Sequence, residues 1–136
     1  MTASDEHLRR TAVLGTIDEK TGLSTWAVGD DSVAVRSAGY ALVQLYEEMV
    51  KLSAAAEVAR ASSELTEAGK KSQLRKLGND FERVDIEAAL AGREALAEAS
   101  VSIGKNDFSR SQRLQTGLRQ LDGLISSARS RSSALI

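Results

Sequence analysis

The chain contains neither proline nor cysteine, and only 4% of its 136 residues are aromatic. Proline is the strongest helix breaker, so its absence favours long, uninterrupted helices. Without cysteine, a disulfide framework and a cysteine-based metal site are both excluded. The apolar residues, 42% of the chain, are mainly Ala, Leu and Val. This composition favours a helical fold over an all-β sandwich.

No stretch approaches the roughly 20 apolar residues that a membrane-spanning helix requires. The first seven residues also lack the apolar segment of a signal peptide. We therefore expect a soluble protein without a membrane span, either cytoplasmic or exported by a leaderless route to the bacterial surface.

The 18 basic and 19 acidic residues nearly cancel, which argues against a protein whose main work is binding nucleic acid or anionic lipid. The balance is uneven along the chain, because residues 105–136 carry 6 basic and 2 acidic side chains. This asymmetry predicts a basic last helix that faces more acidic helices.

A chain of this length is expected to form one domain. Residues 1–30 are predicted to form an N-terminal arm or a short β-hairpin, since 11–17 and 23–28 are rich in β-branched residues and flank a turn. Residues 31–136 are predicted to form an all-α domain, either a bundle of three or four helices or a coiled-coil hairpin. The expected helices cover about 31–77, 80–103 and 107–134.

Glycines punctuate the helical part of the chain. Gly69, and more strongly Gly78 followed by the capping pattern of Asn79 and Glu82, predict that the first helix ends between 68 and 77. Gly104 and Asp107 repeat this pattern before the last helix. Four more glycines fall inside the expected helices: Gly39, Gly92, Gly117 and Gly123. Each costs on the order of 1 kcal/mol relative to alanine, so these helices need packing partners to persist.

Two helical stretches carry small or apolar residues that are alternately four and three positions apart, which is a heptad pattern. The first seam consists of Ala38, Leu42, Leu45, Met49, Leu52, Ala56 and Ala59. The last seam consists of Leu114, Leu118, Leu121, Ile125, Ala128, Ser132 and Leu135. The spacing predicts that both seams pack against other helices, either inside one bundle or between subunits. The predicted interface residues are Leu42, Leu45, Met49, Leu52, Ala56, Ala59, Leu114, Leu118, Leu121, Ile125 and Leu135, with Trp26 of the arm.

The middle helix shows two apolar stripes, and two stripes predict two neighbours. One stripe consists of Phe81, Val84, Ala88, Ala91 and Ala95. The other consists of Ile86, Leu90, Ala97 and Val101.

Signatures of catalysis and of metal binding are scarce. His7 is the only histidine, and it has no second ligand at metal-binding spacing. The usual nucleophile, phosphate and zinc motifs are absent from the sequence. The carboxylates Asp80, Glu82, Asp85 and Glu87 are spread around their helix. We therefore predict no enzymatic activity, no cofactor and no metal site.

Basic residues gather in two places, which leaves nucleic-acid binding as an alternative. They are Lys70, Lys71, Arg75 and Lys76, and on the last helix Arg110, Arg113, Arg119, Arg129 and Arg131. Neither group has interleaved aromatic residues for base stacking, nor a known DNA-binding motif spacing. Nucleic acid is therefore not the expected partner.

Residues 38–46 (AGYALVQLY) and 120–126 (QLDGLIS) resemble the terminal helices of the filament-forming translocator subunits of bacterial type III secretion. The resemblance implies that these two helices pair as a coiled coil, that subunits polymerise into an extracellular tube, and that a cytoplasmic chaperone holds the monomer.

The sequence thus predicts a non-enzymatic protein that works by helix–helix association. The first hypothesis is a self-assembling structural subunit of a secretion or surface apparatus, with a homo-oligomer or a helical protein as partner. The alternatives are an intracellular adaptor or small chaperone that offers a helical groove to a client protein, and a nucleic-acid-binding helical protein.

Overall fold

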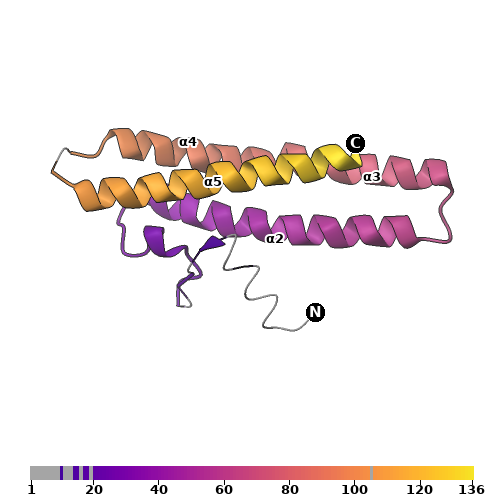
Figure 1. Ribbon diagram of the computed structural model, residues 1–136, viewed down its shortest axis with the longest axis horizontal. Coiled ribbons are helices and arrows are strands. Elements are labelled where there is room, and N and C mark those ends of the chain that lie inside the picture. The colour runs from indigo at the N-terminus through magenta and orange to yellow at the C-terminus, as the bar shows by residue number, and fades with distance from the viewer. Residues whose placement is uncertain (1–9, 11–13, 16, 19, 105) are drawn as a thin grey trace.

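The computed structural model describes residues 10, 14, 15, 17, 18, 20–104 and 106–136. These residues form an all-α bundle of three rods, in which the middle rod runs antiparallel to the first and the last (Figure 1), and this confirms the predicted fold class. The first rod is α2 (Val33–Ala61) and the last is α5 (Phe108–Leu135). The middle rod, called here the long helix, runs through α3 (Glu67–Phe81), the π-helical segment η2 (Glu82–Ile86) and α4 (Glu87–Val101). No described helix combines the length and apolarity that crossing a bilayer requires.

Side-chain caps fix where the rods begin. The hydroxyl of Ser32 accepts a hydrogen bond from the Val35 backbone N–H, and the carboxylate of Asp107 accepts one from Arg110. The cap at Asp107 was predicted from the sequence. The turn between α2 and α3 comes earlier than predicted, because Thr66 caps α3 by accepting from the N–H of Gly69. The prediction that the first helix ends between 68 and 77 is therefore wrong.

Gly78 lies inside the long helix rather than at its end, and the reason is steric. A Cβ added at Gly78 would lie 2.8 Å from the carbonyl oxygen of Ser132 on α5. A Cβ at Gly92 would lie 2.9 Å from that of Ala41 on α2. These glycines therefore allow neighbouring helices to approach closely, which partly explains why residues of low helix propensity occur there.

The η2 segment changes which side chains of the long helix face the core. A π-helical turn contains one more residue than an α-helical turn, so it shifts the helical phase of the residues after it. Of the residues on the two predicted stripes, Val84 is 54% exposed and Val101 is 87% exposed, whereas Ile86 is buried; Ala89, which lies on neither stripe, is also buried. The two stripes predicted for this helix are therefore wrong in part.

The N-terminal residues that the structure describes contain little β-structure. Ile17 and Ser24 form a single antiparallel bridge, and Gly22 in the turn between them has φ +73°. Thr25–Ala27 forms the 3-10 helix η1, so the strand predicted over 23–28 is wrong. Residues 11–13 and 16 of the other expected strand lie outside the described residues.

Candidate functional site

The predicted interface residues lie inside a single chain, where both seams face the same core. Buried are Leu42, Leu45, Met49, Leu52, Ala56, Ala59, Leu114, Leu121, Ile125 and Trp26. Leu118 and Leu135 are partly buried at the edge of this core. These side chains already have packing partners within the chain. The outer faces of the helices and the grooves between them therefore remain for contact with another molecule.

The η1 segment covers part of the groove between α2 and α5, because it packs against both helices. Trp26 is only 5% exposed, and its indole N–H donates to the Gln120 side-chain oxygen at 2.9 Å. A Cβ added at Gly117 would lie 2.8 Å from the Trp26 ring, so the ring rests directly on the helix backbone. This covering is part of the fold and leaves little room for a ligand.

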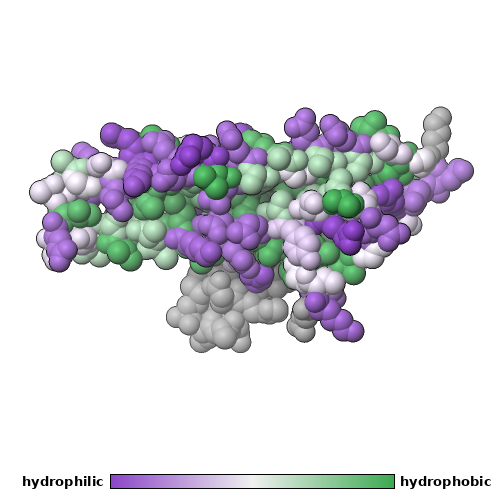
Figure 2. Space-filling view, turned by 180° about the vertical axis from the view of Figure 1, so that it is seen from behind, coloured by the Kyte–Doolittle hydropathy of each residue, from purple (hydrophilic) through white to green (hydrophobic). Residues whose placement is uncertain are grey.

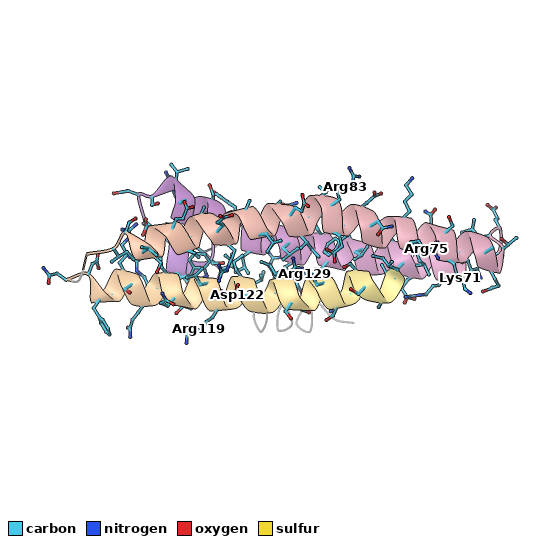
Figure 3. All side chains as sticks on the ribbon, turned by 90° about the horizontal axis from the view of Figure 1, so that it is seen from above. Lys71, Arg75, Arg83, Arg119, Asp122 and Arg129 are labelled. Carbon is cyan, nitrogen blue, oxygen red and sulfur yellow. The ribbon has the colours of Figure 1, made fainter. Side chains whose placement is uncertain are left out.

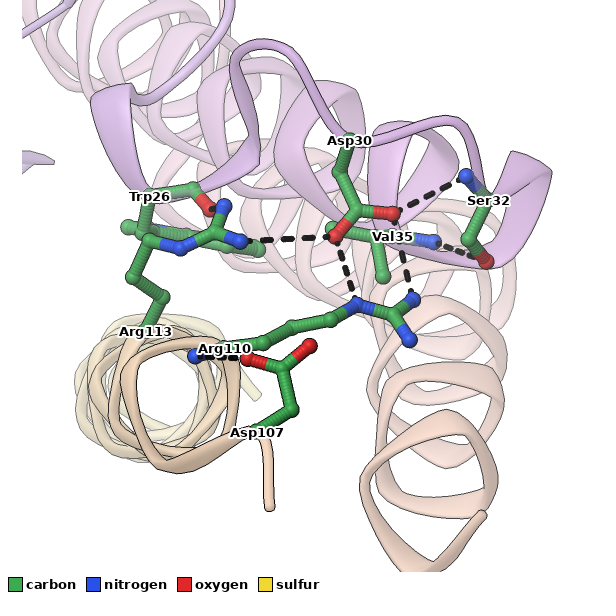
Figure 4. A network of polar contacts seen from close by, with 7 residues as sticks. All are labelled: Trp26, Asp30, Ser32, Val35, Asp107, Arg110 and Arg113. Carbon is green, nitrogen blue, oxygen red and sulfur yellow. Dashed lines mark hydrogen bonds and ion pairs between the residues drawn. The ribbon is translucent and has the colours of Figure 1, made fainter. Parts of the chain in front are cut away.

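A buried carboxylate fixes the start of α5 to the start of α2 (Figure 4). Arg110 donates two hydrogen bonds to Asp30, at 3.0 and 3.2 Å, and the Ser32 backbone N–H donates a third at 2.9 Å. Burial opposes the ionisation of Asp30, but the hydrogen bonds and the positive charges of Arg110 and Arg113 outweigh it and lower its pKa below the usual value. This network therefore has a structural role, and it accounts for part of the basic character of α5.

Polar contacts cross the groove between the long helix and α5. Arg93 pairs with Asp122 at 2.8 Å, and the buried hydroxyl of Ser132 donates to Glu82 at 2.6 Å. Figure 3 shows Arg129 and Asp122 in this region, with Arg119 pointing away from the long helix. Arg93 and Asp122 thus satisfy each other in this groove, whereas no side-chain hydrogen bond or ion pair of Arg129 is found among the described residues.

The groove between α2 and the η2 region differs, because it has an apolar floor and a mainly acidic rim. We call it the η2 groove; it is lined by Glu48, Lys51, Leu52, Ala55, Leu77, Asp80, Phe81, Val84 and Asp85. Figure 2 looks at the molecule from the side opposite to Figure 1 and shows apolar patches between hydrophilic side chains. Exposed apolar side chains such as Val84, next to a concave surface, are typical of sites where proteins bind one another.

Asp85 stands out among the charged residues of the η2 groove. Lys51 pairs with Glu48, and Arg83 pairs with Asp80, both at 3.1 Å. Among the described residues, no ion pair involves Asp85. Its partial burial, and secondarily the nearby charge of Glu48, raise the pKa of Asp85 above the usual value, although the charge of Lys51 partly opposes this shift. A cationic group in the groove would therefore stabilise this carboxylate.

Sequence reasoning missed the η2 groove, because the spacing placed Val84 on a buried stripe. The sequence contains one indication: the apolar positions around 81–89 follow no single continuous stripe, and no helix break separates them. A π-helical segment explains both facts, because the helix continues while its side chains change direction, and such segments are frequent at functional sites.

The carboxylates considered as metal ligands do not converge. Within the described ranges, no group of three or more His, Asp or Glu side chains is arranged to hold a metal ion. His7 lies outside the described residues.

The basic residues considered for nucleic-acid binding are divided among different contacts. Figure 3 shows Lys71 and Arg75 beside the C-terminal end of α5. Lys70 pairs with Glu67 at 3.5 Å, whereas Arg110 is held by Asp30. The structure therefore does not bring the whole set together on one face.

Comparisons of this chain with models of known families, with curated proteins and with solved structures gave no match. The evidence for a function therefore comes from the residues of the chain itself.

Proposed function

We propose that the protein is a non-enzymatic binding module that receives a helical segment of a partner protein in the η2 groove. The observation that carries this proposal is the partly buried carboxylate of Asp85, which has no ion-pair partner among the described residues, beside the exposed side chain of Val84. Three carboxylates and one lysine line the groove, so a partner helix with an apolar face and a basic residue is complementary to it.

The loss of folding stability that Asp85 causes in the isolated protein supports this proposal. A carboxylate whose pKa is raised by burial destabilises the fold at neutral pH. Such a cost is typical of residues that serve binding rather than stability. Filament formation and secretion, which the resemblance implied, remain predictions.

Site-specific photocrosslinking tests the proposed function. A photoreactive amino acid replaces Val84 and, as a control, Val58, which is 72% exposed on α2 and does not line the groove. In the cells that naturally produce the protein, the Val84 probe should form a covalent product with one helical protein, and Asp85→Lys should abolish it. Equal products from both probes, or a Val84 product that persists with Asp85→Lys, would refute docking in the η2 groove. A crosslinked product with the mass of two 14.5 kDa chains would show that the occupant of the groove is a second copy of this chain and would refute docking of a different protein.

A further inference from the structure

The long helix carries opposite net charges in its two halves. α3 has four basic and two acidic residues, whereas η2 and α4 together have two basic and five acidic residues. Two such helices that lie antiparallel place the positive half of each beside the negative half of the other.

The side of the long helix that faces away from the core makes this complementarity specific. We call this side the outer stripe; it consists of Ser72, Lys76, Asn79, Arg83, Glu87, Ala91, Glu94 and Glu98, and all eight are exposed. Figure 3 shows Arg83 on the side of the long helix away from α5. The stripe spans about 40 Å at the usual helical rise.

The spacing of the outer stripe is symmetric about its centre. Successive positions differ by 4, 3 and 4 in the α3 half and again by 4, 3 and 4 in the α4 half. The central step of four, from Arg83 to Glu87, crosses the π-helical segment. A regular heptad would require three there, so the extra residue of η2 is what keeps Glu87 and Glu94 on the same face as Arg83 and Lys76.

We infer that the outer stripe pairs with the outer stripe of a second copy in a two-fold symmetric, antiparallel dimer. In this arrangement, residues whose numbers add to 170 face each other, so Arg83 meets Glu87 and Lys76 meets Glu94. Two-fold symmetry produces each of these contacts twice. Asn79 meets Ala91, which gives the helices a small, uncharged contact between the charged ones.

The charge pattern also selects the orientation. A parallel pair would place Arg83 against Arg83 and Glu87 against Glu87, and like charges would repel. In the antiparallel pair, every charged contact between these four positions is attractive. Among the described residues, Lys76, Glu87 and Glu94 have no ion-pair partner within the chain, so they are available to a second copy.

The outer stripe and the lining of the η2 groove share no residue, but Arg83 of the stripe pairs with Asp80 of the groove at 3.1 Å. Crosslinking of positions 79 and 91, neither of which lines the groove, therefore tests the dimer separately from the proposed partner docking. Because exposed ion pairs are weak and are screened by salt, the dimer affinity should fall roughly tenfold or more when salt rises from about 0.05 M to about 0.5 M.

Charge-swap variants of the full chain test the inference by sedimentation velocity. Arg83→Glu and Glu87→Arg should each be monomeric alone, since each places two like-charge contacts in the dimer. A mixture of the two variants should dimerise again, because every contact between positions 83 and 87 is then attractive. The double variant should also dimerise. Arg119→Glu, on the exposed face of α5, is the control and should leave the dimer affinity within about twofold of the wild-type value.

Cysteine crosslinking provides a second readout that does not depend on charge, because the natural chain has no cysteine. Asn79→Cys and Ala91→Cys should form a disulfide-linked dimer only when mixed, since position 79 faces position 91 of the other copy. Crosslinking of Asn79→Cys with itself would show a different orientation and overturn the inference. A monomer at low salt, or single charge variants that dimerise like the wild type, would overturn it as well.

Discussion

Gly117→Ala and Gly123→Ala add the same methyl group to the same helix, six positions apart, and the structure predicts opposite effects on stability. A Cβ at Gly123 would meet no atom within 4 Å, whereas one at Gly117 would lie 2.8 Å from the ring of Trp26. Replacing glycine by alanine in a helix stabilises it by about 0.5–1 kcal/mol. At Gly117 this gain is opposed by overpacking, which costs about 1–3 kcal/mol.

We therefore expect Gly123→Ala to raise the free energy of unfolding by about 0.5–1 kcal/mol and Gly117→Ala to lower it by about 1 kcal/mol. For a chain of this size, 1 kcal/mol corresponds to a change in Tm of about 4 °C. Circular dichroism during heating measures both changes. The fluorescence of Trp26, the only tryptophan, reports whether its surroundings change.

A double variant identifies the cause of the loss. Trp26→Leu removes the ring that the added methyl group would meet, so alanine at position 117 should destabilise the Trp26→Leu background less than it does the wild type. If Gly117→Ala and Gly123→Ala stabilise the protein equally, the packing of Trp26 on the backbone of α5 is refuted.

Three further predictions concern buried groups. Leu121→Asp places a charge at a fully buried core position and should lower the free energy of unfolding by about 4 kcal/mol or prevent folding; a melting curve like that of the wild type would show that the last seam is not buried. Asp30→Asn should cost about 1–2 kcal/mol near neutral pH. Because the pKa of Asp30 is lowered in the fold, the difference in free energy of unfolding between wild type and variant should shrink as the pH falls below the pKa of an ordinary carboxyl. Urea unfolding at a series of pH values measures this difference. Asp85→Asn should raise Tm at neutral pH, because the raised pKa makes the ionised form unfavourable, and this difference should disappear in acid; a lower Tm at neutral pH would contradict the raised pKa.

The heptad spacings were sufficient to predict the rods and most of the core. Leu42, Leu45, Leu114 and Leu121 are buried as expected, because a four–three spacing places them on one side of a helix whatever the partner is. The cap at Asp107 was predictable for a similar reason, since capping depends on residues close in sequence.

The features that sequence reasoning missed depend on contacts between distant residues. Gly78 has the local signature of a helix end, and only the approach of Ser132 explains why the helix continues through it. Val84 was placed on a buried stripe because sequence spacing alone does not show that residues 82–86 form a π-helical segment. Asp85 was interpreted only as one of several scattered carboxylates, because its burial depends on α2.

The contacts of Trp26 with Gln120 and of Asp30 with Arg110 join positions that are 94 and 80 residues apart. Closing such long loops has a large entropic cost, which is recovered only after the three rods have paired. We therefore expect these contacts to form late in folding, so removing them should speed unfolding more than it slows folding. On this reasoning, the contacts of the segment from Trp26 to Asp30 determine the unfolding rate of the bundle, and therefore the lifetime of the folded state.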